Sequence, residues 1–422
     1  MSDQFIFWDL ETTGRNDKFD QITQVGAVLT DHNFEVKDKL EIHSKLREGK
    51  WFEPGALITT GVDPLNLFQN NYPNYYEASA QLYETFQQWS SPSAIFVGFN
   101  NINFDEPFLR QALYQNLMPE IYMTVTNNNV RMDVFDILRL VSVYSPEHIK
   151  FNTDDQGYPI LKLEEIFKKN NITINYEAGP HDAVFDSLVT LELNKILSIR
   201  CPQIWKSAYD FRLRDTPKKF LLNNLVFTNT TFWGRRPTIK AQTLIAGIPG
   251  KNHHYLVYNL LFDPKKLQDL DDKELHKKMN DGVKRICEVF DGSKSKTLLN
   301  ESYCFKDNRF AEIGVDELRS RANFIKNNEE FCSRLINLHI ENQKQWPEPF
   351  NIEERIFENF PSPQDKKLML DFHTSPNNKK FEVSQQFKDD RYKELAIRII
   401  YEVAPHTLPD QERRNYELEI QE

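Results

Sequence analysis

Two acidic residues at alternate positions, Asp9 and Glu11, follow the apolar run Phe5 to Trp8 near the start of the chain. Residues i and i+2 of a strand point to the same face, so both carboxylates would project from one side of a largely buried strand. Acids in such a place are costly unless a cation lies between them, and oxygen ligands favour Mg²⁺ or Mn²⁺. The alternative is a strand end whose acids face solvent, which the buried approach disfavours.

Two later segments carry side chains of related chemistry. Asp105 follows the apolar segment 94–99 and stands at the start of a predicted helix, where a carboxylate also suits the helix dipole. Taken alone, it is equally typical of a helix N-cap. His181 and Asp186 follow the chain break Gly179-Pro180, with His181 in a loop or first turn and Asp186 in the next helix. Each of these two, taken alone, is typical of an ordinary surface or core residue.

The acids indicate a function only when they are considered together. Four carboxylates gathered within about 4 Å would repel by several kcal/mol per pair at an effective dielectric of about 20, so divalent cations must neutralise them. A pair of ions roughly 3.5–4 Å apart clamps a phosphodiester, one ion activating the attacking water and the other stabilising the leaving oxygen. The sequence therefore suggests metal-dependent phosphodiester hydrolysis with two Mg²⁺ ions, Mn²⁺ being the alternative, if these acids converge: Asp9, Glu11, Asp105 and Asp186.

Strand-like and helix-like segments alternate over the first two hundred residues, which favours an α/β domain. Strands are expected at 5–8, 22–30, 34–44 and 94–99, a short turn or helix at 54–61, and helices at 75–89, 103–114, 130–143, 161–170 and 183–199. Residues 220–261 have the pattern of short strands separated by turns. A linker is expected around Trp346 to Pro349, and the tail from Ile352 onward is expected to be helical.

The chain has 422 residues and a net charge of −10, so it is long enough for two or three domains and acidic overall. Any nucleic-acid path must then be a local basic groove. The candidates are the segments 205–219 and 233–236, which combine Trp with Lys or Arg. The alternative is an ordinary linker and a hairpin with solvated charges.

The four cysteines are scattered and form no C-x-x-C motif, which indicates free thiols in a reducing compartment: Cys201, Cys287, Cys304 and Cys332. A signal peptide and a run long enough to span a bilayer are both missing from the sequence pattern. A cytoplasmic protein with no membrane association is therefore expected.

Three motifs in a fixed order resemble a known group of enzymes. D-L-E-T-T-G begins at Asp9, N-x-x-F-D ends at Asp105, and H-D-A-x-x-D spans 181–186. The ordered set resembles the DEDD exonuclease superfamily in its His-containing branch. Segments at 54–61, 133–136, 161–164 and 232–235 extend the resemblance to bacterial exodeoxyribonuclease I over nearly the whole chain.

The resemblance implies three domains that curve into a groove for single-stranded DNA. The expected fold class is α/β, with a ribonuclease-H-like exonuclease domain (1–199), an SH3-like β-rich domain (200–347) and a helical C-terminal domain (350–422).

The resemblance also implies roles for individual residues. Asp9, Glu11 and Asp186 match metal ligands, Asp105 matches the fourth acid, and His181 matches the general base that deprotonates the attacking water. A neutral imidazole near pH 7 suits that task. Contacts to the substrate are implied for Glu11, Leu10, Thr12, Phe104, Lys162 and Arg235. Lys162 stands where the family usually carries Arg, so a point charge replaces a bidentate fork.

The implied activity is 3′→5′ degradation of single-stranded DNA to 5′-mononucleotides in DNA repair and recombination. A monomer is expected, with the C-terminal tail of single-stranded-DNA-binding protein as a partner. One alternative is a related nuclease that acts on RNA or in proofreading, although such proteins are usually small and compact. Another is a DNA-binding scaffold without activity, which the presence of all five expected catalytic residues disfavours.

Overall fold

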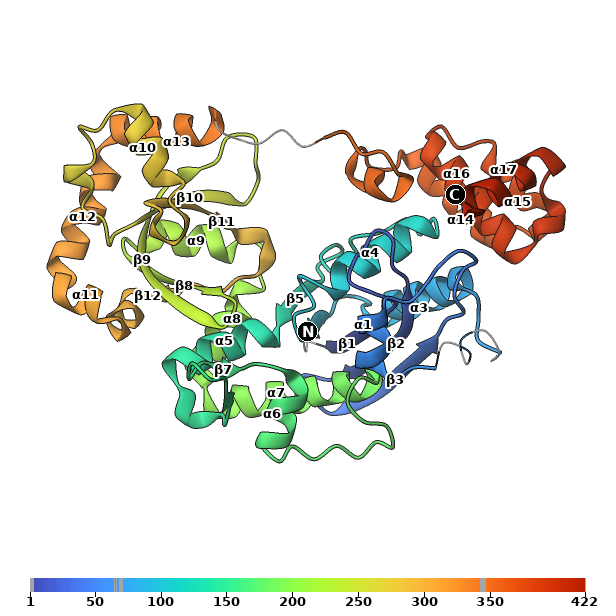
Figure 1. Cartoon of the computed structure of the whole chain (residues 1–422), viewed down its shortest axis with the longest axis horizontal. Coiled ribbons are helices and arrows are strands. Elements are labelled where there is room, and N and C mark those ends of the chain that lie inside the picture. Colours follow the sequence, from blue (N-terminus) through green and yellow to red (C-terminus); the bar gives the residue numbers. More distant parts are fainter. Residues whose placement is uncertain (1–3, 64, 66, 68–70, 342–346, 422) are drawn as a thin grey trace. The chain divides into compact units, whose positions relative to one another are not determined.

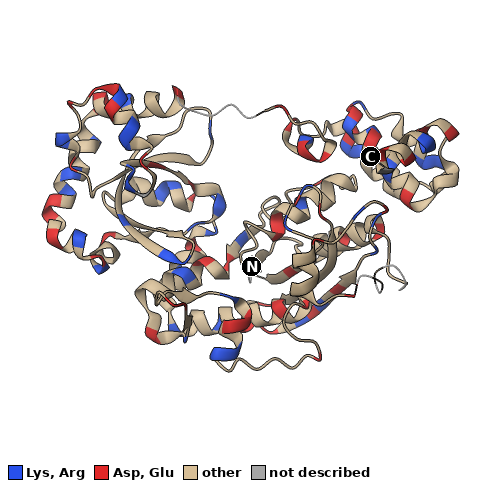
Figure 2. Cartoon of the chain, viewed as in Figure 1, with Lys and Arg blue, Asp and Glu red and all other residues tan. Residues whose placement is uncertain are grey.

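The computed structural model describes residues 4–63, 65, 67, 71–341 and 347–421, and its contacts divide the chain into two compact units (Figure 1). The first unit comprises Met1–Arg131, Thr173–Glu192 and Pro347–Glu422, and the second comprises Met132–Ile172 and Leu193–Trp346. The three-domain division at 1–199, 200–347 and 350–422 stays a prediction. Lys and Arg are interspersed with Asp and Glu along the helices of both units (Figure 2).

The first unit is built around a five-stranded sheet in the order β3-β2-β1-β4-β5. Its strands are β1 (Phe5–Thr12), β2 (Ile22–Thr30), β3 (Val36–His43), β4 (Ile95–Gly98) and β5 (Val130–Asp133). β1 pairs antiparallel with β2 and parallel with β4. The register places Glu11 opposite Gln24 and Asp9 opposite Gly26, so these four residues share one face of the sheet. The four strands expected from the sequence are confirmed.

The single helix expected at 130–143 was wrong at its start. Residues Val130–Asp133 form the strand β5, and the helix α5 runs from Val134 to Tyr144. Asp133 ends the strand and caps the helix, because its Oδ1 accepts a hydrogen bond from the backbone N–H of Phe135 at 2.9 Å. The apolar periodicity of the segment does not mark this change.

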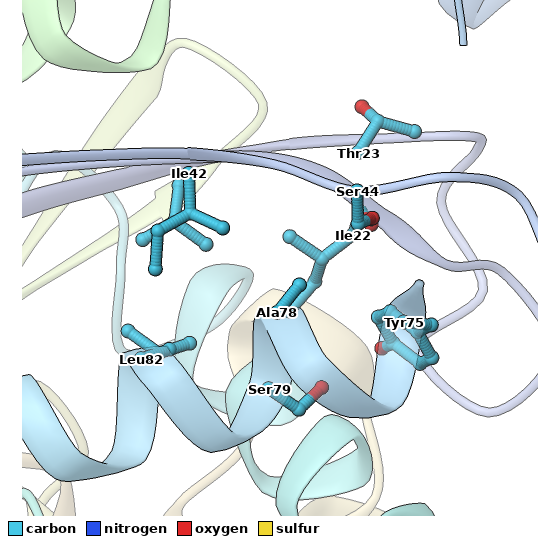
Figure 3. A pocket seen from close by; sticks show the side chains of 9 residues that line it. Ile22, Thr23, Ile42, Ser44, Tyr75, Ala78, Ser79 and Leu82 are labelled. Atoms are coloured by element: carbon cyan, nitrogen blue, oxygen red, sulfur yellow. The ribbon is translucent and has the colours of Figure 1, made fainter. Parts of the chain in front are cut away.

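Helix α3 (Tyr75–Trp89) covers the sheet face that lies opposite the acids. Asn74 and Glu77 form a capping box at its start, and its apolar stripe packs on the strands. Trp8 of β1 meets Phe86 edge to face, with ring centroids 5.9 Å apart. Between α3 and the strands a cavity of about 10 Å³ remains, lined by Ile22, Ile42, Ala78, Leu82 and their neighbours (Figure 3). That volume suits about one water.

The C-terminal helices belong to the same unit as this sheet. They are η6 (Ile352–Phe357), α14 (Pro363–Thr374), α15 (Asn377–Ser384), α16 (Asp390–Val403), η7 (Pro405–Thr407) and α17 (Asp410–Gln421). Their apolar side chains join Tyr76 of α3 and Tyr114 of α4 in one buried cluster that includes Phe372 and Leu395. The remaining helices near the sheet are α1 (Pro54–Thr60) and α4 (Asp105–Gln115), together with the first half of α7 (Ala183–Arg200).

The second unit contains a five-stranded antiparallel sheet in the order β11-β10-β9-β8-β12. Its strands are β8 (Phe227–Trp233), β9 (Arg236–Gly247), β10 (His254–Asn259), β11 (Cys287–Asp291) and β12 (Leu299–Asn300), and a separate hairpin joins β6 (Asn152–Thr153) to β7 (Pro159–Ile160). The expected β-rich segment is confirmed from residue 227 onward. Residues 220–223, expected in a strand, end the helix α9.

The second unit also contains helices. Their bounds are α6 (Leu163–Lys169), α8 (Pro202–Phe211), α9 (Thr216–Asn223), α10 (Asp272–Met279), α11 (Asn308–Ile313), α12 (Val315–Asn327) and α13 (Glu329–Glu341), with single 3-10 turns η1 (Pro146–His148), η2 (Pro264–Lys266), η3 (Gly282–Lys284), η4 (Gly292–Lys294) and η5 (Glu301–Lys306). The basic and aromatic segment 205–219 therefore lies on α8 and α9 and is not a linker. Of the linker expected at 346–349, Trp346 lies outside the described residues, and 347–349 have no regular structure.

The four cysteines are free thiols, as expected. Among the described residues, we find no helix that combines the length and the apolar character needed to cross a membrane.

Candidate active site

β1 presents the first two acids of the site. Phe5 to Trp8 are buried in the sheet, and Asp9 and Glu11 are half-buried on the face away from α3. Burial raises the pKa of Glu11 to about 9, and the charges of Asp186, Asp105 and Asp182 add to the effect. The pKa of Asp9 is raised well above its ordinary value, first by burial and then by the same acidic neighbours.

Asp105 reaches the same place from the start of α4. Its side chain is buried, and its Oδ1 accepts a hydrogen bond from the backbone N–H of Leu10 on β1 at 3.0 Å. Burial raises the pKa of Asp105 to about 7, although hydrogen bonds from backbone N–H groups act to lower it. The N-cap of α4 is Phe104, so the N-cap interpretation of Asp105 was wrong. The carboxylate of Asp105 instead joins the first turn of α4 to the acid-bearing strand.

His181 and Asp186 come from the turn that opens α7. Asp182 caps the helix, since its Oδ1 accepts from the backbone N–H groups of Val184 at 3.1 Å and Phe185 at 3.0 Å. His181 has a φ of +69°, which is uncommon for a residue other than glycine. Its backbone N–H donates to Asp186 Oδ2 at 3.3 Å, so the turn folds back onto the acid in the helix.

The structure brings the predicted catalytic residues into one neighbourhood. One ligand atom each from Glu11, His181 and Asp186 lies within 4.8 Å of the others. Asp9 and Asp105 adjoin this group, because the pKa of Asp9 responds to the charges of Asp105, Asp186 and Glu11. The catalytic and metal-ligand roles of these five residues remain predictions.

The chemistry of the donor set fits a divalent metal ion. The charged neighbours that shift the pKa values of Asp9, Glu11 and Asp105 are all acids. A partly buried cluster of carboxylates is relieved either by holding protons or by binding a cation. Carboxylate oxygens and one imidazole are ligands that a hard or borderline divalent ion accepts.

The substrate contacts implied by the motifs fall into two groups. Leu10 and Thr12 are buried on β1, and Phe104 is half-buried beside Phe108, with ring centroids 5.0 Å apart. Lys162, at the N-cap of α6, and Arg235, on the turn between β8 and β9, belong to the second unit. Arg235 forms an ion pair with Asp154 at 3.2 Å. The DNA contacts of all these residues stay predictions.

Sequence reasoning missed the residues that seat α7 on the sheet. Gln24 of β2 hydrogen-bonds to Asp182 and to the backbone of Ala183, and Gly26 lies directly under the helix start. The register signal was present, because Gln24 and Gly26 alternate on one strand as Glu11 and Asp9 do on the next.

Known proteins are similar to this chain in sequence. Residues 350–422 match the family model of the Exonuclease I C-terminal domain. The exodeoxyribonuclease I of Buchnera aphidicola subsp. Schizaphis graminum is 22% identical over 408 residues, which cover 93% of this chain and 82% of the relative. The predicted resemblance to bacterial exodeoxyribonuclease I is confirmed.

Solved structures share the fold. The crystal structure of Escherichia coli Exonuclease I in complex with a dA16 oligonucleotide superposes with a TM-score of 0.86 at 20% identity, covering 99% of this chain and 91% of that one. A structure of SSB/Exonuclease I in complex with an inhibitor gives a TM-score of 0.81 at 21% identity, covering 100% and 90%. The predicted α/β fold class with a helical C-terminal part is thereby confirmed.

Proposed function

We propose that this protein is an exodeoxyribonuclease I that degrades single-stranded DNA in the 3′→5′ direction and releases 5′-mononucleotides. The observation that carries the proposal is the meeting of Glu11, His181 and Asp186 within 4.8 Å, with Asp9 and Asp105 beside them. A site that binds cations beside a reacting phosphate accounts for several acids on one buried strand and its neighbours. The similarity to exodeoxyribonuclease I supports the same conclusion.

The acids would hold the metal that the reaction needs. Asp9, Glu11 and Asp186 are the proposed ligands of two Mg²⁺ ions, for which Mn²⁺ can substitute, and Asp105 is the fourth acid. When bound, the ions supply charge that activates the attacking water and stabilises the leaving oxygen. Asp105 also fixes the first turn of α4 against β1, through the hydrogen bond from Leu10.

His181 is the proposed general base. Its imidazole would accept the proton of the attacking water, a transfer that contributes roughly 10²–10⁴-fold to rate in enzymes. The turn geometry serves this role, because the left-handed backbone of His181 and its N–H bond to Asp186 place the ring next to Glu11. The same turn therefore delivers both a proton acceptor and a metal ligand.

The proposed substrate path begins at the residues that flank the acids and continues on basic and aromatic side chains. Leu10, Thr12, Phe104 and Glu11 would contact the terminal nucleotide, and Lys162 and Arg235 would contact the backbone. A complex of Exonuclease I with dA16 supports a single strand as the substrate, and a structure of SSB with Exonuclease I supports single-stranded-DNA-binding protein as a partner. We expect a cytoplasmic monomer that acts in DNA repair.

The decisive experiment compares labelled single-stranded DNA, double-stranded DNA and RNA, each with Mg²⁺ and with EDTA. We expect Mg²⁺-dependent release of 5′-mononucleotides, fastest from single-stranded DNA labelled so that loss from the 3′ end is visible. Faster digestion of RNA would overturn the substrate assignment. Binding of DNA without any digestion would identify a scaffold in place of an enzyme.

A further inference from the structure

Gln24 joins the sheet to the start of the catalytic helix. It lies on β2 opposite Glu11, and only 6% of it is exposed. Its Nε2 donates to Asp182 Oδ2 at 2.8 Å, and its Oε1 accepts from the backbone N–H of Ala183 at 3.2 Å. One amide group thus uses both its donor and its acceptor on two consecutive residues of the turn that opens α7.

Asp182 in turn hydrogen-bonds to the backbone at the start of α7. Its second oxygen, Oδ1, accepts from the backbone N–H groups of Val184 and Phe185 in the first turn of α7. The contacts of Gln24 Nε2 to Glu41 and His43 are longer, 3.4 and 3.5 Å, so the Asp182 bond dominates. Both carboxylate oxygens of Asp182 are therefore used for positioning.

Two residues farther along β2, Gly26 lets the helix lie directly on the strand. A Cβ at this position would overlap the backbone of Ala183 and Val184. Ser187 Oγ, fully buried, donates to the carbonyl of Gly26 at 3.0 Å. The start of α7 is thus held to β2 at Gln24 and at Gly26.

This helix start carries Asp186, and His181 immediately precedes it. Asp186 lies one helical turn beyond Asp182, and the backbone N–H of His181 donates to it, so a shift of the helix start relative to Glu11 would break the bond from Gln24 to Asp182. We propose that Gln24 is a positioning residue of the catalytic cluster: by holding Asp182 and Ala183 it sets the distance from His181 and Asp186 to the acids of β1. This inference rests on the proposed nuclease function.

The chemistry of an amide suits this position. Asp186 and the acids of β1 repel one another until cations are bound, so the helix start needs attachments that oppose this repulsion. A Lys or Arg opposite Glu11 would pair with the carboxylates and compete with metal ions, and an acid would add to the repulsion. Glutamine donates and accepts hydrogen bonds without charge.

The first test replaces Gln24 by methionine, which keeps the length and the volume of the side chain but removes both hydrogen bonds. We expect kcat on single-stranded DNA to fall by roughly 10–100-fold, with KM unchanged, and Mn²⁺ affinity measured by titration calorimetry to weaken by a similar factor. Gln115→Met is the matched control, because Gln115 is also 6% exposed and donates to the carbonyl of Lys18 at 3.0 Å. This control variant should lose stability but keep the kcat and the Mn²⁺ affinity of the wild type. Unchanged kcat and Mn²⁺ affinity in Gln24→Met would overturn the inference.

Exchanging the hydrogen-bond donor and acceptor between positions 24 and 182 gives a second, independent test. Gln24→Glu places a carboxylate against Asp182 and should lower kcat and Mn²⁺ affinity. Adding Asp182→Asn reverses the donor and acceptor, since Asn Nδ2 can donate to the new carboxylate while its oxygen still caps α7. Recovery of Mn²⁺ affinity in the double variant supports the positioning role, and no recovery opposes it. If the wild-type protein binds Mn²⁺ but digests no DNA, the proposed function fails while the Mn²⁺ readout still decides on Gln24.

Discussion

The acids of the site hold protons more tightly than free carboxyl groups do. Glu11 has a pKa of about 9 and Asp105 a pKa of about 7, in both cases chiefly because burial disfavours the charged form. At neutral pH without metal, Glu11 is therefore largely protonated, and Asp105 is partly so. Metal ions that bind these acids would have to displace the protons, which would link metal binding to pH and to stability.

The first prediction follows from this linkage. The folded-state pKa of Glu11 lies above its ordinary value of 4.5, so between about pH 4.5 and about pH 9 the folded state binds more protons than the unfolded state. Stability of the metal-free protein should therefore fall as pH rises through this window. The rise in Tm caused by saturating Mg²⁺ should be larger at about pH 8.5 than at about pH 6. Differential scanning fluorimetry with EDTA or Mg²⁺ measures both.

Glu11→Gln provides the control for this linkage. The variant removes the group with the pKa of about 9, so the Tm of the metal-free protein should depend less on pH than in the wild type. An Mg²⁺-induced shift of equal size at both pH values in the wild-type protein would contradict the prediction.

The second prediction concerns the general base. His181→Ala should lower kcat by roughly 10²–10⁴-fold, because proton transfer from the attacking water loses its acceptor. Part of the rate should return at higher pH, where hydroxide is more abundant, and DNA binding should be retained. Steady-state kinetics from neutral to alkaline pH measure this, with His32→Ala as a control at an exposed histidine. A wild-type rate in His181→Ala at neutral pH would remove His181 from the mechanism.

At the scale of elements, the site depends on how closely two of them approach. α7 can deliver Asp186 to the acids only because β2 lacks a side chain at Gly26. The helix backbone occupies the space of a Cβ at this position, and the carbonyl of Gly26 binds Ser187. The contact between β2 and α7 is therefore part of the geometry of the proposed active site as well as of the core.

The third prediction tests this close approach. In Gly26→Ala the new methyl group must push α7 away from β2, since backbone atoms cannot yield as a flexible side chain can. We expect stability to fall by about 1–3 kcal/mol and kcat to fall with it. Gly247→Ala, at the end of β9 with nothing within 4 Å of its Cβ, is the matched strand control and should be neutral. Wild-type kcat in Gly26→Ala would show that the approach is not needed for catalysis.

The turn between β8 and β9 carries an exposed aromatic side chain among charges. Trp233 is 78% exposed, and Arg236 lies over the ring of Tyr158 at 5.5 Å. Such a combination is typical of a surface on which bases stack and phosphates are attracted.

The fourth prediction is that Trp233→Ala weakens binding of a long single strand by about 1–3 kcal/mol, the usual worth of one base stacked on an aromatic ring. Hydrolysis of a nitrophenyl ester of a mononucleotide, which is too short to reach beyond the acids, should be unchanged. Fluorescence anisotropy with labelled oligonucleotides measures the affinity. Leu222→Ala, at a residue that is 63% exposed, is the control. Equal affinities of wild type and Trp233→Ala would exclude this stacking role.

At the scale of the whole molecule, the C-terminal residues 350–422 are anchored to the sheet-containing part of the first unit. Glu402 of α16 accepts a hydrogen bond from the backbone N–H of Tyr75, the first residue of α3, at 2.7 Å. It also accepts from Arg47 Nε at 2.6 Å. Both side chains of this ion pair are nearly buried, at 10% and 12% exposure. The pair therefore ties the last third of this unit to its first.

The fifth prediction is that Glu402→Ala destabilises the protein by about 3 kcal/mol, because it leaves the buried guanidinium of Arg47 without its carboxylate. Urea unfolding measures the change. Glu382→Ala removes an exposed partner of Lys379 and should change stability by less than about 1 kcal/mol. Equal stabilities of the two variants would show that the Arg47–Glu402 pair is not an anchor.

The sequence by itself determined those features that follow from local periodicity and from the order of the motifs. The two-residue alternation of Asp9 and Glu11 placed them on one face of β1, because side chains of a strand alternate between faces. The ordered motifs supplied Asp105, His181 and Asp186, and the apolar runs located most strands and helices. Such features are encoded within a few residues.

The tertiary structure decided what depends on contacts between distant segments. It placed Asp105 on the backbone of Leu10, seated α7 on Gln24 and Gly26, and turned residues 130–133 into a strand that the helical periodicity of 130–143 concealed. It also put residues 350–422 and the sheet that carries Asp9 and Glu11 into one unit. A hydrogen bond or a close approach between residues a hundred positions apart leaves no periodic trace in either segment, so only the folded chain shows it.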